Sequence, residues 1–280
     1  GVEPDELRRV LNGRLAGFIY ALDNVGGFGG VADRLNAYNI YLGEPGRITS
    51  DLLRYQRVTI EQIREVAERF LANRPRVALT VKRKPAVTTG LPLDRATAPG
   101  SKPSAAFRVP KPSVHTLRCG TPLWVIPKRE LPIVAMSCIV LAGAGAHAPE
   151  QGGLSSLTSN LIDEGTTTRS ARELALAAEN IGTHLSTDTG WDGSYVGMQC
   201  LTPHLDESLE LALDILRNPT FPQEEFDRIK GQTLAARKAD REKAEVRASR
   251  GLASALYPRD HPYGVSTEGS EESVSRLSRA

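Results

Sequence analysis

The chain has 280 residues, and 35 basic side chains nearly balance 33 acidic ones, which leaves a formal net charge of +2. This balance argues against an obligate nucleic-acid binder, and the length suggests about two globular domains. With 40% hydrophobic and 24% charged residues, the composition is globular and excludes a disordered chain. The longest uncharged apolar stretch, residues 131–146, is shorter than the ~20 residues of a membrane-spanning helix, so no membrane span is expected.

Residues 1–85 carry the signals of several helices and one strand. Apolar side chains recur at helical spacing from Pro4, which predicts an amphipathic helix that ends near Gly26. A single strand does not form a stable sheet, so we expect the rest of its sheet to lie upstream. The further predicted elements are helices over residues 30–41, 49–55 and 59–71 and a strand over 76–81.

A stretch without periodicity, residues 86–108, is rich in Pro, Gly, Ser and Thr and is predicted to be a linker between two domains, 1–85 and 109–280. Strands then alternate with groups of helices, which indicates an α+β fold: a mainly antiparallel sheet covered by helices. The predicted strands are residues 115–119, 122–127, 133–141, 184–188 and 194–202, the first three as an antiparallel meander with a tight turn at 119–121. The predicted helices are residues 152–163, 170–182, 206–217 and 222–253.

Local signals fix several of these elements. Ser170 and Glu173 form a capping-box pattern, and Gly182 is a typical helix end. In the helix over 206–217 we expect Leu209, Leu213 and Leu216 to share the buried face. The three cysteines, Cys119, Cys138 and Cys200, are too few and too scattered for a disulfide framework, and each is predicted to be a buried thiol in a strand.

Several short motifs occur in an order that is typical of a known family. The first domain contains Leu35-Asn36-Ala37-Tyr38, Gly43-Glu44-Pro45-Gly46 and Asp51-Leu52-Leu53-Arg54-Tyr55. The second contains Leu123-Trp124-Val125-Ile126-Pro127, Leu131-Pro132-Ile133-Val134, Arg217-Asn218-Pro219-Thr220-Phe221 and His261-Pro262-Tyr263-Gly264. Together they resemble the insulinase (pitrilysin-type) zinc metallopeptidases, whose domains have the fold of mitochondrial processing peptidase. The resemblance implies that residues 1–85 end one such domain and residues 109–280 begin another.

Active members of this family place H-x-x-E-H on the helix before a Gly-Thr pair, where the histidines hold zinc and the glutamate is the general base. Counted back from Gly165-Thr166, this chain has Ser156 and Asn160 at the ligand positions and Ser159 at the base position. Neutral hydroxyl and amide oxygens are poor replacements for imidazole at a zinc site. We therefore predict no catalytic residue and no metal site in this chain, which would be inactive by itself.

The third zinc ligand of the family is a glutamate on the later long helix, where the alignment places Ala236. A shifted register would place Glu242 or Glu245 there, but a single carboxylate would still face Ser156 and Asn160. Another reading, a serine hydrolase, is disfavoured because the serines near 155–159 lack a Gly-x-Ser-x-Gly elbow. Three isolated candidates, His147, His184 and Trp191, are interpreted as packing or capping residues.

In active members the strand after the second helix pairs with an extended peptide substrate by β-augmentation. The resemblance assigns this role to His184, Leu185, Ser186, Thr187 and Asp188. It implies a metalloendopeptidase in which this chain contributes the inactive half that closes a chamber for peptides or unfolded polypeptides. The zinc would lie in the active half, which is the expected protein partner.

An alternative is a scaffold or assembly subunit that has the same fold and no proteolytic role, as in the respiratory-complex core subunits of the family. An H-x-x-E-H motif elsewhere in the protein, or in a neighbouring subunit, would distinguish the two. Because exposed sheet edges favour self-association, a homodimer is a further expectation. Related bacterial proteins are often exported, which favours the periplasm.

Overall fold

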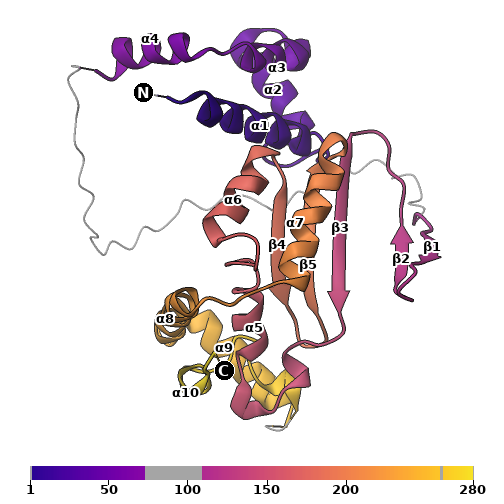
Figure 1. Cartoon of the computed structure of the whole chain (residues 1–280), viewed down its shortest axis with the longest axis vertical. Coiled ribbons are helices and arrows are strands. Elements are labelled where there is room, and N and C mark those ends of the chain that lie inside the picture. Colours follow the sequence, from indigo (N-terminus) through magenta and orange to yellow (C-terminus); the bar gives the residue numbers. More distant parts are fainter. Residues whose placement is uncertain (1, 73–108, 259–260, 280) are drawn as a thin grey trace, which may run out of the picture. The chain divides into compact units, whose positions relative to one another are not determined.

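A computed structural model describes residues 2–72, 109–258 and 261–279 (Figure 1). The chain divides into two compact units, one formed by residues 1–60 with 131–280 and the other by 61–130. The predicted linker, residues 86–108, and the predicted strand at 76–81 lie outside the described residues, so the proposed domain boundary stays a prediction. No helix in the described ranges has the length and apolar character needed to cross a membrane.

A three-stranded antiparallel sheet forms the centre of the larger unit. The strand order is β3 (Ile133–Val140), β5 (Ser194–Leu201) and β4 (His184–Thr189), with Met136 and Leu185 both opposite Met198 of β5. Val196, Met198 and Cys200, alternate residues of β5, are buried, as expected for a strand with one face covered. β3 and β4 are the two edges of this sheet. Because β3 pairs with β5, the predicted meander of three consecutive strands is wrong.

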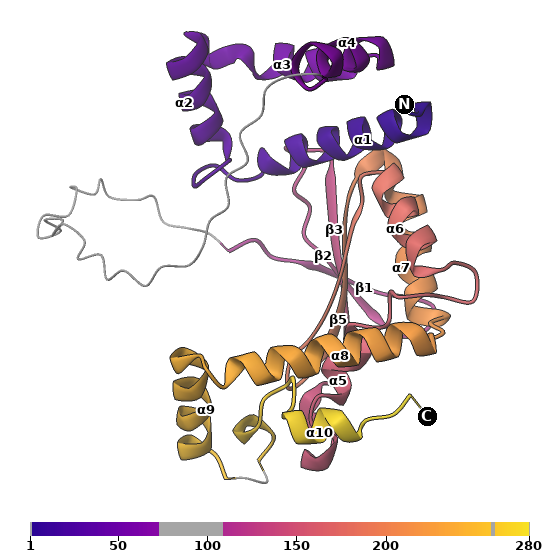
Figure 2. The same cartoon turned by 90° about the vertical axis from the view of Figure 1, so that its left-hand side faces the viewer.

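Two helices, α6 (Ala171–Asn180) and α7 (Leu205–Arg217), pack against one face of this sheet (Figures 1 and 2). Their core contains Leu174 of α6, Val196 of β5, and Leu211 and Ile215 of α7. The α+β class with an antiparallel sheet covered by helices is therefore confirmed. The buried face predicted for α7 is partly wrong, since Leu213 is 43% exposed. A residue two positions from Leu211 or Ile215 points away from the sheet at helical periodicity.

The predicted capping box at the start of α6 is confirmed. The Glu173 amide donates to the Ser170 hydroxyl, and the Glu173 carboxylate accepts from the Ser170 amide. The predicted end at Gly182 is also confirmed, with a φ of +64°. A Cβ on Gly182 would lie 2.7 Å from Cβ of Ala16, so glycine is needed there for the close approach of another helix.

That helix is α1 (Pro4–Ala21), the first of three N-terminal helices, followed by α2 (Val31–Leu42) and α3 (Ile48–Gln56). Its Tyr20 hydroxyl donates to the carbonyl oxygens of Gly182, at 2.8 Å, and of Gln199 in β5, at 3.2 Å. Burial and the neighbouring Cys200 raise the pKa of Tyr20 to about 12. The N-terminal helices therefore belong to the same compact unit as the sheet.

The helix predicted from Pro222 to residue 253 is two helices, α8 (Gln223–Asp240) and α9 (Ala244–Leu256). The corner between them is held by the buried carboxylate of Asp240, which lies 3.0 Å from Nζ of Lys243 and 3.7 Å from a guanidinium nitrogen of Arg250. In one continuous helix, the backbones of Asp240 and Arg250 would be ~15 Å apart, too far for this contact. The remaining helices of this unit are the short α5 (Leu154–Ser159) and α10 (Glu271–Arg276).

The smaller unit contains α4 (Ile60–Phe70) and a hairpin of β1 (Ser113–Thr116) and β2 (Pro122–Val125). The predicted turn between these strands is confirmed: Gly120 has a φ of +87°, and its amide donates to the Leu117 carbonyl. Cys119 lies in this turn and is exposed, so its expected burial is wrong. Cys200 is buried as expected, whereas Cys138 is half-buried.

The carboxylate of Asp214 in α7 accepts hydrogen bonds from four side chains. It accepts from the hydroxyls of Thr166, at 2.8 Å, and Thr168, at 2.7 Å, and from Arg169 and Asn218, at 2.9 and 2.8 Å. Burial alone raises the pKa of Asp214, but the donors outweigh it and lower the pKa to about 2. This carboxylate ties the loop before α6 to α7.

The substitution Asp214→Asn is expected to reduce the free energy of unfolding at neutral pH by about 3 kcal/mol, because Arg169 loses its buried partner. Urea-induced unfolding measures this change. Glu210→Gln is the matched control, since Glu210 pairs with the same guanidinium at 2.9 Å but is 70% exposed. It should cost less than about 1 kcal/mol. Equal losses in the two variants would contradict the structural role of Asp214.

The contribution of Asp214 should also depend on pH. Its folded-state pKa of about 2 lies below the ordinary value of 3.8. The stabilisation is therefore fully present above the ordinary pKa and is lost as the pH falls through the folded-state value. The stability difference between the natural chain and Asp214→Asn should narrow by roughly 2 kcal/mol between about pH 5 and pH 2. A difference that is constant with pH would be the contrary result.

Candidate functional site

The helix predicted to carry the altered zinc motif, α5, ends at Ser159, earlier than the expected residue 163. Asn160 follows as its C-cap, and its amide donates to the Ser156 carbonyl at 3.0 Å. Ser159 is buried, Ser156 is half-buried and Asn160 is exposed. Leu157 and Leu161 fix this segment by packing against Phe226 of α8.

An open hollow of about 400 Å³ lies beside the end of α5. Three segments that are distant in the sequence form its walls: the residues that follow α5, one residue of β4, and one face of α8. Figure 2 shows α8 crossing close to α5. The lining residues are Asn160, Asp163, Glu164, Thr187, Ile229, Gln232 and Thr233.

Two of the predicted residues meet at this hollow: Asn160, from a ligand position of the motif, and Thr187, from the predicted peptide-binding strand. Ser156 and Ser159 are not among its lining residues. Ala236 is exposed on α8, about one helical turn beyond Thr233 and on the same helical face. The assignment of these positions by resemblance stays a prediction.

The predicted peptide-binding residues form nearly all of β4. Along this strand, His184, Ser186 and Asp188 are exposed, while Leu185 and Thr187 are half-buried. Leu185 packs against the core that α6 and α7 share with the sheet. Thr187 therefore points to the helix-covered face, and one edge of β4 has no neighbouring strand among the described residues.

The charges around the hollow are not balanced. The Glu164 carboxylate pairs with Arg228 at 2.6 Å, and Arg228 also pairs with Glu225 at 2.6 Å. Burial raises the pKa of Asp163. In the described ranges, no basic side chain forms an ion pair with Asp163. The hollow therefore has one carboxylate, that of Glu164, with a cation beside it and one without.

The side chains at the hollow do not fit a zinc ion. No imidazole or thiol lines it, and no group of three or more His, Cys, Asp and Glu residues that could hold a metal occurs in the described part of the chain. Amide and hydroxyl groups from Asn160, Gln232 and Thr233 instead offer hydrogen-bond donors and acceptors. The arrangement suits the binding of a polar chain.

Sequence reasoning missed five residues of the hollow: Asp163, Glu164, Ile229, Gln232 and Thr233. Gln232 and Thr233 share the helical spacing of Ala236, so the predicted third ligand position already indicated their face of α8. Asp163 and Glu164 closely follow the altered motif but carried no signal of their own.

Trp191 was predicted to be a packing or capping residue. Its ring lies 5.5 Å from that of Tyr263, and its indole N–H donates to the Val265 carbonyl at 3.2 Å.

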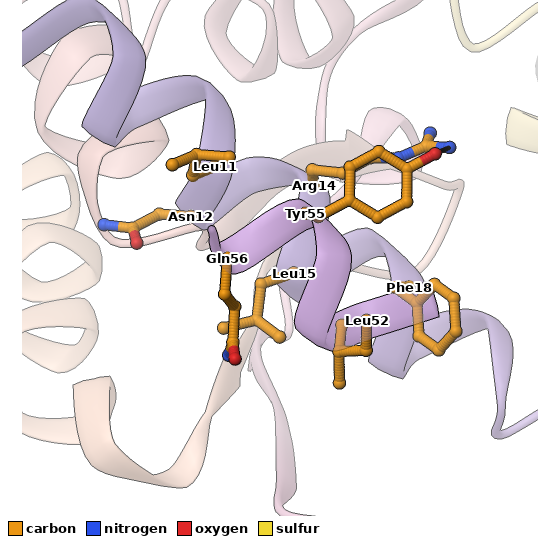
Figure 3. A pocket seen from close by; sticks show the side chains of 8 residues that line it. All are labelled: Leu11, Asn12, Arg14, Leu15, Phe18, Leu52, Tyr55 and Gln56. Atoms are coloured by element: carbon orange, nitrogen blue, oxygen red, sulfur yellow. Dashed lines mark hydrogen bonds between the residues drawn. The ribbon is translucent and has the colours of Figure 1, made fainter. Parts of the chain in front are cut away.

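A second, smaller pocket of about 200 Å³ lies between α1 and α3 (Figure 3). The Arg14 guanidinium meets the Tyr55 hydroxyl at its rim, 3.2 Å away. The other lining residues are mainly apolar: Leu11, Leu15, Phe18 and Leu52, with Asn12 and Gln56. No acid–base pair lines this pocket, and it is best described as a packing defect between two helices.

Several known proteins resemble part of this chain. The sequence profile described as insulinase (peptidase family M16) matches residues 126–270, just over half of the chain. An uncharacterized zinc protease from Rickettsia felis is 30% identical over 93 residues, which are 33% of this chain and 23% of that protein. A non-peptidase homologue from Helicobacter pylori is 24% identical over 147 residues, 52% of this chain and 34% of the homologue.

Among solved structures, the inactive domain of an M16 peptidase from Pseudomonas fluorescens matches with a TM-score of 0.56 and 24% identity. The match covers 60% of this chain and 41% of that one. The chain thus spans less than half the length of each of these relatives. The fold and the sequence profile agree with the motifs, and the chain belongs to the insulinase family of peptidases.

Proposed function

We propose that this chain contributes the non-catalytic half of an insulinase-type metallopeptidase and binds an extended peptide along β4. One observation carries the proposal: Asn160, which the resemblance assigns to a ligand position, lines the same hollow as Thr187 of β4, an edge strand of the described sheet. The binding surface of the site is thus present while the catalytic side chains are replaced.

Backbone groups are sufficient for the proposed binding. An edge strand offers unpaired N–H and C=O groups, and an added strand forms main-chain hydrogen bonds that require no particular side chain. β4 has six residues and neither proline nor a β-bulge in its register with β5, so its edge is regular. The replacement of zinc ligands by Ser156 and Asn160 therefore removes hydrolysis but leaves this mode of binding intact.

Cleavage would take place in the active half of the parent protein. There a zinc ion held by H-x-x-E-H supplies the activated water. This chain would close against that half, enclose a peptide or unfolded polypeptide, and hold it in an extended conformation. The matches cover 23% and 34% of the length of two relatives, as expected if this chain is one part of a longer protein or assembly.

A scaffold or assembly role is the second candidate. It is favoured by the relative named a non-peptidase homologue and by the solved inactive domain. The two roles differ in whether an H-x-x-E-H motif occurs in the rest of the protein or in a partner subunit. They also differ in peptide binding, which a pure scaffold does not need.

Extended peptides with backbone N-methyl groups at alternate positions test the binding mode. Two peptides are compared, one methylated at odd and one at even positions. In one of them the methyl groups block the N–H groups that face β4, and in the other they block only the N–H groups that point away. We expect the first peptide not to bind and the second to bind, with affinity measured by fluorescence anisotropy. Each peptide is the control for the other. Equal binding of both would contradict pairing along β4.

Zinc content tests the absence of a catalytic site in this chain. We expect elemental mass spectrometry to find far less than one zinc per chain after mild dialysis, and a quenched fluorescent peptide to stay uncleaved with added zinc. Ser156 and Asn160 lack the imidazole that such a site needs. Stoichiometric zinc with chelator-sensitive cleavage would show that the motif is aligned wrongly.

A further inference from the structure

The hollow beside β4 lies where a side chain of a paired peptide would point. Along β4, Thr187 lines the hollow, whereas its neighbours Ser186 and Asp188 are exposed on the opposite face. Directly opposite residues of two paired strands project to the same face, with Cβ atoms about 5 Å apart. A peptide residue opposite Thr187 would therefore direct its side chain toward the hollow.

The hollow is large enough for a long side chain and has little apolar surface to hold one. Its volume is about 400 Å³, and Ile229 is the only aliphatic residue in its lining. The other walls carry amide, hydroxyl and carboxylate groups. A hydrophobic side chain would gain little there, whereas a side chain with several hydrogen-bond donors would find acceptors on Asn160, Gln232 and Thr233.

The charge of the hollow decides which polar side chain is favoured. Glu164 is matched by Arg228, but Asp163 has no cation beside it in the described residues. A half-buried carboxylate without a counter-ion is destabilised by desolvation, and an arriving cation relieves that cost. A carboxylate side chain of a peptide would be repelled for the same reason.

We propose that this hollow is a specificity pocket for a lysine or arginine side chain of the bound peptide, with Asp163 as its counter-ion. The inference rests on the proposed pairing of a peptide with β4 and adds a preference that backbone pairing alone would not produce. Lysine and arginine carry the donors that the amide and hydroxyl lining accepts, and their aliphatic stems can lie along Ile229.

Peptides that differ only at one position test the preference. Lysine, alanine or glutamate is placed at each position of one extended peptide in turn, and affinity for the 280-residue chain is measured by fluorescence anisotropy. At one position, lysine should bind about tenfold more tightly than alanine, and glutamate more weakly than alanine, as expected for one charge-assisted hydrogen bond. The alanine peptide reports backbone pairing alone.

The substitution Asp163→Asn keeps the shape of the side chain and removes its charge. It should abolish the lysine preference, and far-UV circular dichroism reports whether the variant is folded. Asp206→Asn is the matched control, because Asp206 is exposed in the first turn of α7 and does not line the hollow. It should retain the preference.

A second variant adds a charge. Gln232→Lys places a cation in the hollow that can pair with Asp163, and it should therefore abolish the preference for lysine over alanine. If peptides bind but lysine, alanine and glutamate are equivalent at every position, the specificity pocket is refuted while binding along β4 stands. If no peptide binds at all, the proposed function fails and the pocket fails with it.

Discussion

The pairing of β5 on both of its edges is the constraint on which the rest of the larger unit depends. Its buried residues Val196, Met198 and Cys200 form the floor on which α6 and α7 pack. Its carbonyl groups also reach beyond the sheet, since Gln199 accepts from Tyr20 of α1. With β5 occupied on both sides, β4 is left as an edge. The position of the candidate site therefore follows from the topology of the sheet.

The candidate site lies where a packed segment meets an open strand edge. Leu157 of α5 and Leu161 beyond it pack on Phe226 of α8, whereas Asn160, between them, lines the hollow together with Thr187 of β4. The resemblance places hydroxyl and amide groups at the zinc-ligand positions, and such groups are weak ligands for zinc. One short segment thus combines packing on α8 with polar groups at the hollow.

The features that could be predicted from the sequence are those that depend on residues close together along the chain. The capping box of Ser170 and Glu173 set the start of α6, and the apolar periodicity gave most of the elements and the fold class. It did not predict the corner after Asp240, because that corner depends on ion pairs with side chains of the next helix. Nor did it predict the hollow, whose walls come from three segments and whose unpaired charge on Asp163 depends on where Arg228 points.

The contact between Tyr20 and β5 has a consequence for the order in which the protein is made. The two bonded residues, Tyr20 and Gln199, are 179 positions apart in the chain. At typical rates of synthesis, α1 leaves the ribosome roughly 10 to 30 s before its partner strand exists. During that time the buried Ala16, which lies against Gly182 just before β4, has no partner to pack against. The contact that joins α1 to the sheet can therefore form only after β5 has been made.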